Sequence, residues 1–244
     1  MRHALRTVCL TALVLLPISS ACAHYLWVTI TPKGGMHGTV NIYFEGGPGP
    51  GDGQYLDPFI KRGTTWIRTI DAPKTAVLKV EETKSPGKRW LSAKIPAAAP
   101  RVIDSFAMWG VYTYGKTEVL LHYYAKNAQV SSEAELNKIG RSDKLAFDVA
   151  PTLKGQNVSC EVTWNGKPAP NCKVSVRGPG GFRTSMKTDA KGKLSFAAEK
   201  KGRYTVHATL DEADKSGTQD GKKYDIKRHH STLIMTLPLA ATTE

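Results

Sequence analysis

The first residue that suggests chemistry is His24, which follows the small-residue sequence Ala21-Cys22-Ala23. Cleavage after Ala23 would give His24 a free α-amino group beside its own imidazole ring. Two nitrogens on one residue can chelate a metal ion in the arrangement known as a histidine brace, and nitrogen-rich sites of this kind suit Cu(II) and Ni(II). The sequence therefore predicts a copper or nickel site at the mature N-terminus, which needs a third nitrogen to close it.

The third nitrogen has to come from another histidine of the mature chain. The candidates are His37, His122, His207, His229 and His230. Neighbouring residues of a strand point to opposite faces, so only one of His229 and His230 enters a given pocket. We predict His229 first and His122 second as metal ligands beside His24. For each of them the alternative is an ordinary hydrogen-bonded or exposed histidine.

Residues 1–23 have the three parts of a secretory signal peptide. Two early arginines supply positive charge, residues 8–18 form a short apolar run, and a small-residue cleavage site follows. The run is too short to span a membrane, and no other stretch is apolar enough, so no transmembrane segment is expected in the mature chain. We predict a periplasmic or secreted protein. The alternative is a lipoprotein acylated at Cys22, in which His24 would not be N-terminal.

Two cysteines, Cys160 and Cys172, remain after removal of the signal peptide. A lone pair on either side of a turn in an exported chain predicts a disulfide between them. The alternative is a pair of buried free thiols. The chain has no C-x-x-C motif, so neither reading makes these cysteines catalytic.

The formal net charge is +13, which favours acidic surfaces or polymers as partners. The basic residues fall mostly in loops and on alternate strand positions, and no nucleic-acid-binding motif is present. We therefore predict a solvated basic surface and no nucleic-acid partner. The sequence has no G-x-S-x-G, no H-E-x-x-H and no phosphate loop, so we do not predict an enzyme.

Alternation of apolar and polar residues between Gly, Pro and charged clusters predicts strands along almost the whole chain. The strands predicted in the first half are 24–31, 38–44, 64–70, 74–81, 89–95, 105–114 and 117–125. Those predicted in the second half are 145–149, 158–164, 173–177, 182–187, 193–197, 203–210 and 224–237. One short helix is predicted over 131–138, with Ser131 or Ser132 as its N-cap and Gly140 as its terminator.

This pattern predicts an all-β protein with two β-sandwich-like domains. The first domain covers 24–130 and the second 145–238, with a linker and short helix at 131–144 and a tail at 239–244. The number and spacing of strands in the second domain are those of a small immunoglobulin-like sandwich. Its length is sufficient for one independent core.

The second domain resembles the carboxypeptidase-regulatory or transthyretin-like sandwich. The segments that carry this resemblance are Trp164-Asn165-Gly166-Lys167-Pro168, Val174-Ser175-Val176-Arg177-Gly178-Pro179-Gly180-Gly181, Thr188-Asp189-Ala190-Lys191-Gly192-Lys193 and Gly202-Arg203-Tyr204. Nearly the whole mature chain also resembles the DUF4198 family. The segments concerned are Ala23-His24-Tyr25-Leu26-Trp27-Val28, Leu120-Leu121-His122-Tyr123-Tyr124-Ala125-Lys126, Asp220-Gly221-Lys222-Lys223-Tyr224 and Arg228-His229-His230-Ser231-Thr232-Leu233.

The DUF4198 proteins are exported and are grouped with periplasmic components of nickel and cobalt uptake. The resemblance implies the fold and the location, a membrane transporter or other envelope protein as partner, and a functional role for His229. In that family another histidine tends to follow the strand with the Gly-x-Tyr motif. Here Leu210 stands at that place and His207 lies three residues earlier, which departs from the family pattern.

Three functions fit these observations. The first is a periplasmic carrier or accessory protein that binds copper or nickel without turnover. The second is a structural, adhesion or carbohydrate-binding β-sandwich without a metal. The third is a histidine-brace copper mono-oxygenase. Fold alone does not distinguish them.

Overall fold

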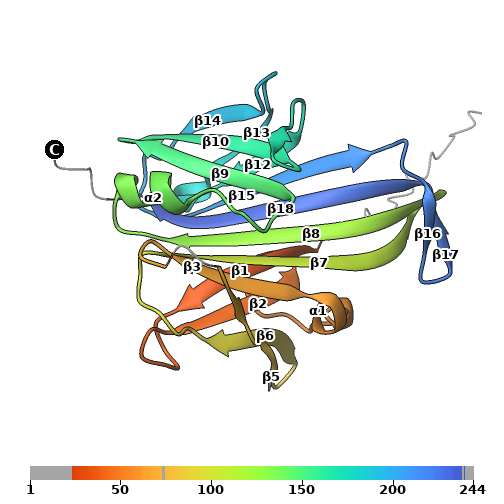
Figure 1. The fold of residues 1–244 in the computed structure, drawn as a ribbon, viewed down its shortest axis with the longest axis horizontal. Helices are drawn as coiled ribbons and strands as arrows, with labels where there is room; N and C mark the ends of the chain where they lie inside the picture. The colour runs from red at the N-terminus through yellow and green to blue at the C-terminus, as the bar shows by residue number, and fades with distance from the viewer. Residues whose placement is uncertain (1–23, 73–74, 238, 240–244) are drawn as a thin grey trace, which may run out of the picture.

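The computed structural model describes residues 24–72, 75–237 and 239, and its strands form three stacked layers (Figure 1). The all-β, sandwich-like architecture predicted from the sequence is confirmed. The predicted signal peptide, 1–23, and most of the predicted tail lie outside the described residues. In the described ranges, none of the helices has the length and apolar character needed to cross a membrane.

The first half of the chain supplies the lower layer and half of the middle one. Its elements are β1 (Tyr25–Thr31), β2 (Thr39–Glu45), α1 (Asp57–Arg62), β3 (Thr64–Thr69), β4 (Ala76–Leu78), β5 (Glu81–Ser85), β6 (Lys88–Lys94), β7 (Arg101–Tyr114) and β8 (Thr117–Gln129). Strands β1, β2, β6 and β5 form the lower sheet, in which all neighbours are antiparallel. The single strand predicted over 74–81 is wrong, because the chain leaves the central sheet after Leu78 and enters the lower sheet at Glu81.

The second half supplies the upper layer and the rest of the middle one. Its elements are α2 (Glu133–Ile139), β9 (Phe147–Lys154), β10 (Asn157–Trp164), β11 (Lys167–Pro168), β12 (Lys173–Arg177), a 3-10 turn (Pro179–Gly181), β13 (Arg183–Lys187), β14 (Lys193–Ala197), β15 (Gly202–Glu212), β16 (Gly217–Gln219), β17 (Lys222–Tyr224) and β18 (Ile226–Leu237). Strands β9, β10, β11 and β14 form the upper sheet. Strands β16 and β17 make a separate hairpin at one end of the molecule (Figure 1).

The central sheet joins the two halves of the chain. Its order is β13-β12-β15-β18-β8-β7-β3-β4, and β18 pairs with β8 in parallel while the other neighbours are antiparallel. The parallel register runs from Ile226 opposite Val119 to Met235 opposite Ala128. The two segments predicted as domains therefore share one sheet, to which each contributes four strands.

The predicted short helix is confirmed as α2. The Ser132 side chain accepts a hydrogen bond from the backbone N–H of Glu135 at 3.3 Å, and the Glu135 carboxylate accepts one from the backbone N–H of Ser132. This reciprocal arrangement is a capping box, which satisfies backbone donors at the start of a helix. Gly140 ends the helix and donates to the carbonyl of Leu136.

Strand β8 is buried on both sides, because it lies between two apolar cores. Tyr124 and Ala128 belong to the upper core, and Tyr123 and Ala125 belong to the lower core. This alternation follows from the period of two in a strand. A strand that is covered on both faces is expected to carry apolar residues almost continuously, as β8 does from Val119 to Ala125 except at His122.

One charged side chain lies within the upper side of β8. Lys126 is 1% exposed, and its Nζ is 2.5 Å from Oδ1 of Asp148 on β9. The same ammonium donates to the carbonyls of Gly140 at 2.5 Å and Val149 at 3.2 Å. A buried ammonium is tolerated when its donors all find acceptors. Lys126 thereby fastens the upper sheet and the end of α2 to the central sheet.

We expect Lys126→Met to lower the free energy of unfolding by about 3–5 kcal/mol, because it leaves the buried Asp148 carboxylate without its cation. Urea denaturation of the mature protein measures this change. Lys144→Met is the matched control, since Lys144 makes only a solvent-exposed ion pair with Asp143; such a pair contributes less than about 1 kcal/mol. Equal losses in the two variants would contradict a structural role for the Lys126 ion pair.

Candidate functional site

His24 lies at the entry to β1, beside the end of β2. His24 directly precedes Tyr25, which pairs with Glu45 at the end of β2. The His24 ring is 5.2 Å from the ring of Tyr55 and 5.9 Å from that of Phe44, measured between centroids. Its side chain is 26% exposed. His24 is thus held on the lower side of the molecule but remains accessible to solvent.

A carboxylate lies beside the His24 ring. Oε2 of Glu45 is 3.8 Å from Nε2 of His24, and the side chain of Glu45 is only 16% exposed. The other carboxylate oxygen accepts a hydrogen bond from the backbone N–H of Gly53 at 3.2 Å. Gly53 has a φ of +65°, and a Cβ there would lie 2.6 Å from Cβ of Arg89, so glycine is required for this contact.

The Glu45 carboxylate favours one tautomer of the His24 ring. Histidines that bind metals commonly donate their second ring N–H to a carboxylate, which fixes the tautomer and the orientation of the ring. Glu45 beside Nε2 favours the proton on that nitrogen. The lone pair is then on Nδ1, which is the nitrogen that chelates together with the α-amine in a histidine brace.

His122 and His229 meet on the opposite, upper side of the central sheet. The parallel register of β8 and β18 places the two residues directly beside each other. Their rings are stacked at 4.8 Å between centroids with an interplanar angle of 25°. The His229 ring also lies 4.2 Å from the ring of Trp164 on β10. His229 is 1% exposed, and His122 beside it is partly buried, so the pair lies between the central and upper sheets.

The hydrogen bonds of His229 use both ring nitrogens. Nε2 is 3.0 Å from Oε1 of Glu212, and Nδ1 is 3.3 Å from the hydroxyl of Tyr124. Nδ1 of His122, in contrast, is buried without a hydrogen-bond partner. Burial, reinforced by the neighbouring His229, lowers the pKa of His122 to about 4. Burial also lowers the pKa of His229, against the opposing effect of the Glu212 carboxylate.

A second histidine pair lies on the lower side of the central sheet, on the neighbouring strands β15 and β18. Nε2 of His207 is 3.1 Å from Nδ1 of His230, and the Tyr25 ring stacks on His207 at 3.9 Å. Burial lowers the pKa of His207 to about 4 and that of His230 well below its usual range. This pair was not predicted. The sequence does not show it, because the pair depends on the antiparallel register of β15 and β18, which places Thr209 opposite His230 and His207 one step along the same face.

The three histidines predicted as metal ligands do not converge. His122 and His229 are in contact, but His24 contacts Phe44 and Tyr55 on the lower side of the molecule. The cause is the layer order, because β1 belongs to the lower sheet while the side chain of His229 points to the upper one. Over the residues that the structure describes, no three His, Cys, Asp or Glu side chains are grouped closely enough to hold a metal ion.

The first strand of the structure lies next to the last one. Oγ1 of Thr232 on β18 donates a hydrogen bond to the carbonyl of Leu26 on β1 at 2.6 Å. The residue of β1 that meets the histidines of β18 is Tyr25, not His24, because the two adjacent side chains point to opposite faces.

The predicted disulfide between Cys160 and Cys172 is not formed, and both residues are free thiols. Cys160 is on β10 in the upper sheet, whereas Cys172 directly precedes β12 of the central sheet. Each packs in the upper core as a small apolar side chain. Burial raises the pKa of Cys160 to about 12 and that of Cys172 to about 11, so neither is a reactive thiolate at neutral pH.

The lowered pKa of His122 predicts acid sensitivity. The usual pKa is 6.5, so between pH 6.5 and about 4 the unfolded chain binds a proton that the folded protein does not. Stability is therefore complete above pH 6.5 and decreases as the pH falls toward 4. We expect His122→Gln to reduce the loss of unfolding free energy between pH 7 and pH 5 by about 2 kcal/mol.

Urea denaturation at pH 7 and pH 5 measures this effect. A change in unfolding free energy that the substitution causes equally at both pH values cancels when the two values are subtracted. His37→Gln is the control, since His37 lies in a loop between β1 and β2. If His122→Gln has the same pH dependence as the unmodified protein, His122 is not a source of the acid sensitivity.

No family model matches this chain, and no curated protein matches it. It is similar to two crystal structures of pullulanase from Anoxybacillus sp. LM18-11, one of them complexed with maltotriose, at 11% and 12% identity. Each match covers 83% of this chain but only 27% of the pullulanase chain, with a TM-score of 0.19. A similarity this low carries no argument about fold or function.

Proposed function

We propose that the mature protein is an exported, periplasmic metal-binding protein that holds Cu(II) or Ni(II) through the α-amine and the imidazole of His24. It acts as a carrier or accessory protein without turnover. The observation that carries this proposal is the Glu45 carboxylate, 3.8 Å from Nε2 of His24. A partly buried carboxylate in that place supports the tautomer that chelation through Nδ1 and the amine requires.

The surroundings of His24 suit an exchangeable site. Tyr55 and Phe44 restrict the ring from two sides, while about a quarter of the side chain stays open to solvent. One residue supplies only two nitrogens, so further coordination positions are left to water or to a ligand from a partner. Sites with open positions exchange their ligands, whereas structural sites are closed by four protein ligands. An open chelate is the arrangement that a carrier needs in order to release its metal.

The resemblance to the DUF4198 family supports the same function. Those proteins are grouped with periplasmic components of nickel and cobalt uptake, and the resemblance includes the segment that begins at Ala23-His24. A membrane transporter or another envelope protein would receive the metal. His122 and His229 are not part of this proposed site, because they lie on the other side of the central sheet.

We expect the mature protein to bind one Cu(II) ion per chain, and Cu(II) more tightly than Ni(II), following the usual order of divalent affinities. His24→Ala should abolish binding, because it removes the ring nitrogen of the chelate. One residue added before His24 should weaken binding strongly, since the amine becomes an amide. Affinity should rise with pH through the range where the amine, with an ordinary pKa near 8, loses its proton. Isothermal titration calorimetry measures the number of ions bound per chain and the affinities for the two metals, for the processed protein and its variants. Titrations at several pH values measure the pH dependence.

Substitution of Glu45 tests the proposed metal site more specifically than substitution of His24 itself. We expect Glu45→Gln to weaken Cu(II) binding about 10- to 100-fold, the usual effect of removing a carboxylate behind a metal-binding histidine. Glu81→Gln is the matched control, since Glu81 is exposed on β5 of the same sheet and pairs only with Lys79. His229→Ala should leave the affinity unchanged. Absence of saturable binding to the processed protein would instead favour a β-sandwich adhesion module without a metal.

A further inference from the structure

Half of one face of the central sheet is not covered by the lower layer. The lower sheet packs through β1 mainly against β18 and β8, and Tyr25 of β1 also stacks on His207 of β15, whereas most of β15 and the strands β12 and β13 extend beyond it. On the upper side of these three strands, Val174, Val176 and Val206 are buried in the upper core. The alternate residues point to the opposite side, where most of them are exposed. This open surface is a flat, three-stranded sheet face.

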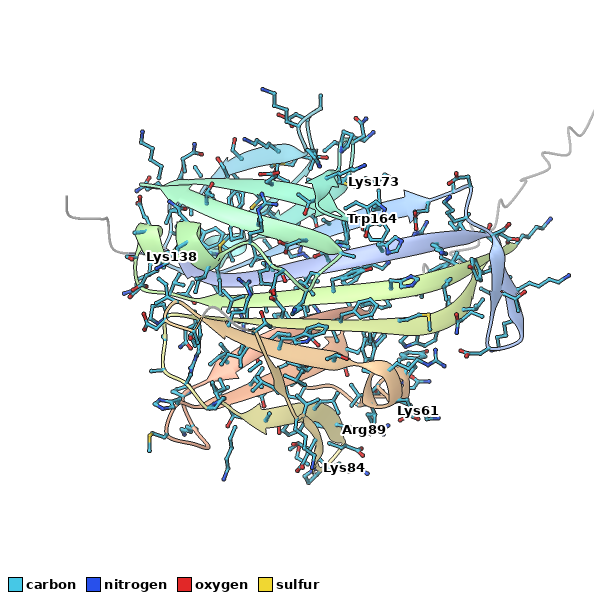
Figure 2. The ribbon with its side chains drawn as sticks, viewed as in Figure 1. Lys61, Lys84, Arg89, Lys138, Trp164 and Lys173 are labelled. Carbon is cyan, nitrogen blue, oxygen red and sulfur yellow. The ribbon has the colours of Figure 1, made fainter. Side chains whose placement is uncertain are left out.

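The exposed side chains of that face are strongly basic. We define the basic face by the residues that point to this side, which are Lys173, Ser175, Arg177, Arg183, Ser185, Lys187, Arg203, Thr205, His207 and Thr209. All five of its lysines and arginines are exposed, and Lys173 is labelled in Figure 2. Across the described part of the chain, no carboxylate lies within ion-pair distance, 4.0 Å, of any of the five. The basic face is therefore an uncompensated positive surface.

The strand register makes this arrangement costly for the fold. Lys173 on β12 is directly opposite Lys187 on β13, and Arg177 is directly opposite Arg183. Like charges at directly opposite positions of neighbouring strands destabilise a sheet. Two such pairs occur side by side on strands of only five residues each. These pairs lower the stability of the free protein, and a ligand that neutralises them would recover that stability.

A shallow depression lies on the same face. It has a volume of about 400 Å³ and is lined by side chains that include Lys173, Ser175, Ser185, Lys187 and His207. The two basic pairs are four residues apart along β12, which corresponds to about 13 Å. The two serines are opposite each other between these pairs, and His207 is opposite Ser175 on β15. Hydroxyl and imidazole groups therefore lie between two separated groups of cations.

We propose that the basic face binds an anionic polysaccharide that lies across β13, β12 and β15. Acidic groups of the polymer pair with Lys173 and Lys187 at one end and with Arg177 and Arg183 at the other. Sugar hydroxyl groups between them exchange hydrogen bonds with Ser175 and Ser185. Binding neutralises the like-charge pairs, so the ligand stabilises the same strands that carry the electrostatic cost.

The chemistry of the face favours this class of ligand over a membrane or a single-stranded nucleic acid. Stable docking on a lipid surface uses apolar side chains that insert beside the basic ones. Single-stranded nucleic acids are held by aromatic platforms on which bases stack. The large apolar side chains that are exposed in the described residues lie elsewhere: Met36, Ile60, Val77, Tyr112 and Tyr114. The basic face offers only cations, hydroxyl groups and one histidine.

The test uses dextran sulfate and uncharged dextran of the same length as probes for the mature protein. Dextran sulfate should bind, with an affinity that falls as salt rises, and uncharged dextran should bind much more weakly. The double variant K173Q/K187Q should bind dextran sulfate about tenfold less tightly. The double variant K222Q/K223Q removes the same charge from the β16–β17 hairpin and should keep the affinity of the unmodified protein.

Three results would overturn the proposal. The first is that dextran sulfate does not bind at low salt. The second is that both double variants lose the same affinity for dextran sulfate. The third is that vesicles of anionic phospholipid bind tightly through Lys173 and Lys187 while dextran sulfate does not bind.

Thermal unfolding gives an independent readout. Removal of a like-charge pair should raise the melting temperature of K173Q/K187Q, whereas a decrease would mean that the two lysines serve the fold instead of a ligand.

Discussion

The parallel pairing of β8 with β18 is the contact on which the arrangement of all three layers depends. The two strands come from opposite halves of the chain and stay in register over ten residue pairs, from Ile226 opposite Val119 to Met235 opposite Ala128. Because this pair lies at the centre of an eight-stranded sheet, both apolar cores are built on it. The buried Lys126, also on β8, connects the same region to the upper sheet through Asp148. Loss of this pairing would separate the layers from one another.

The pairing of β8 with β18 also determines where the histidine side chains lie. It places His122 beside His229 in the upper core, and alternation along β18 places His230 on the lower side with His207. Both pairs are largely buried, and burial lowers their pKa values, so the four rings are neutral at physiological pH. His24 lies outside this enclosed region, beside Glu45 and partly exposed to solvent. Accessibility, more than the number of histidines, therefore distinguishes the candidate metal site.

Much of the fold could be predicted from the sequence, because the local signals are strong. Alternation and turn residues predicted most strands to within a few residues, and Ser132 with Gly140 predicted the limits of α2. The shared central sheet could not be predicted, since nothing local in β8 or β18 indicates that they pair. The site was predicted less well for the same reason. The contact between His122 and His229, the position of Glu45 beside His24 and the free state of Cys160 all depend on strand register and layer order.

The most direct test of the central claim is electron paramagnetic resonance of Cu(II) added to the processed protein. The spectrum of a chain that begins at His24 should be axial and should show hyperfine coupling to two nitrogens, the α-amine and one imidazole. One residue added before His24 should remove the amine coupling and change the spectrum. A spectrum that is identical with and without the added residue would contradict coordination by the N-terminus, because the copper would then be bound elsewhere in the protein.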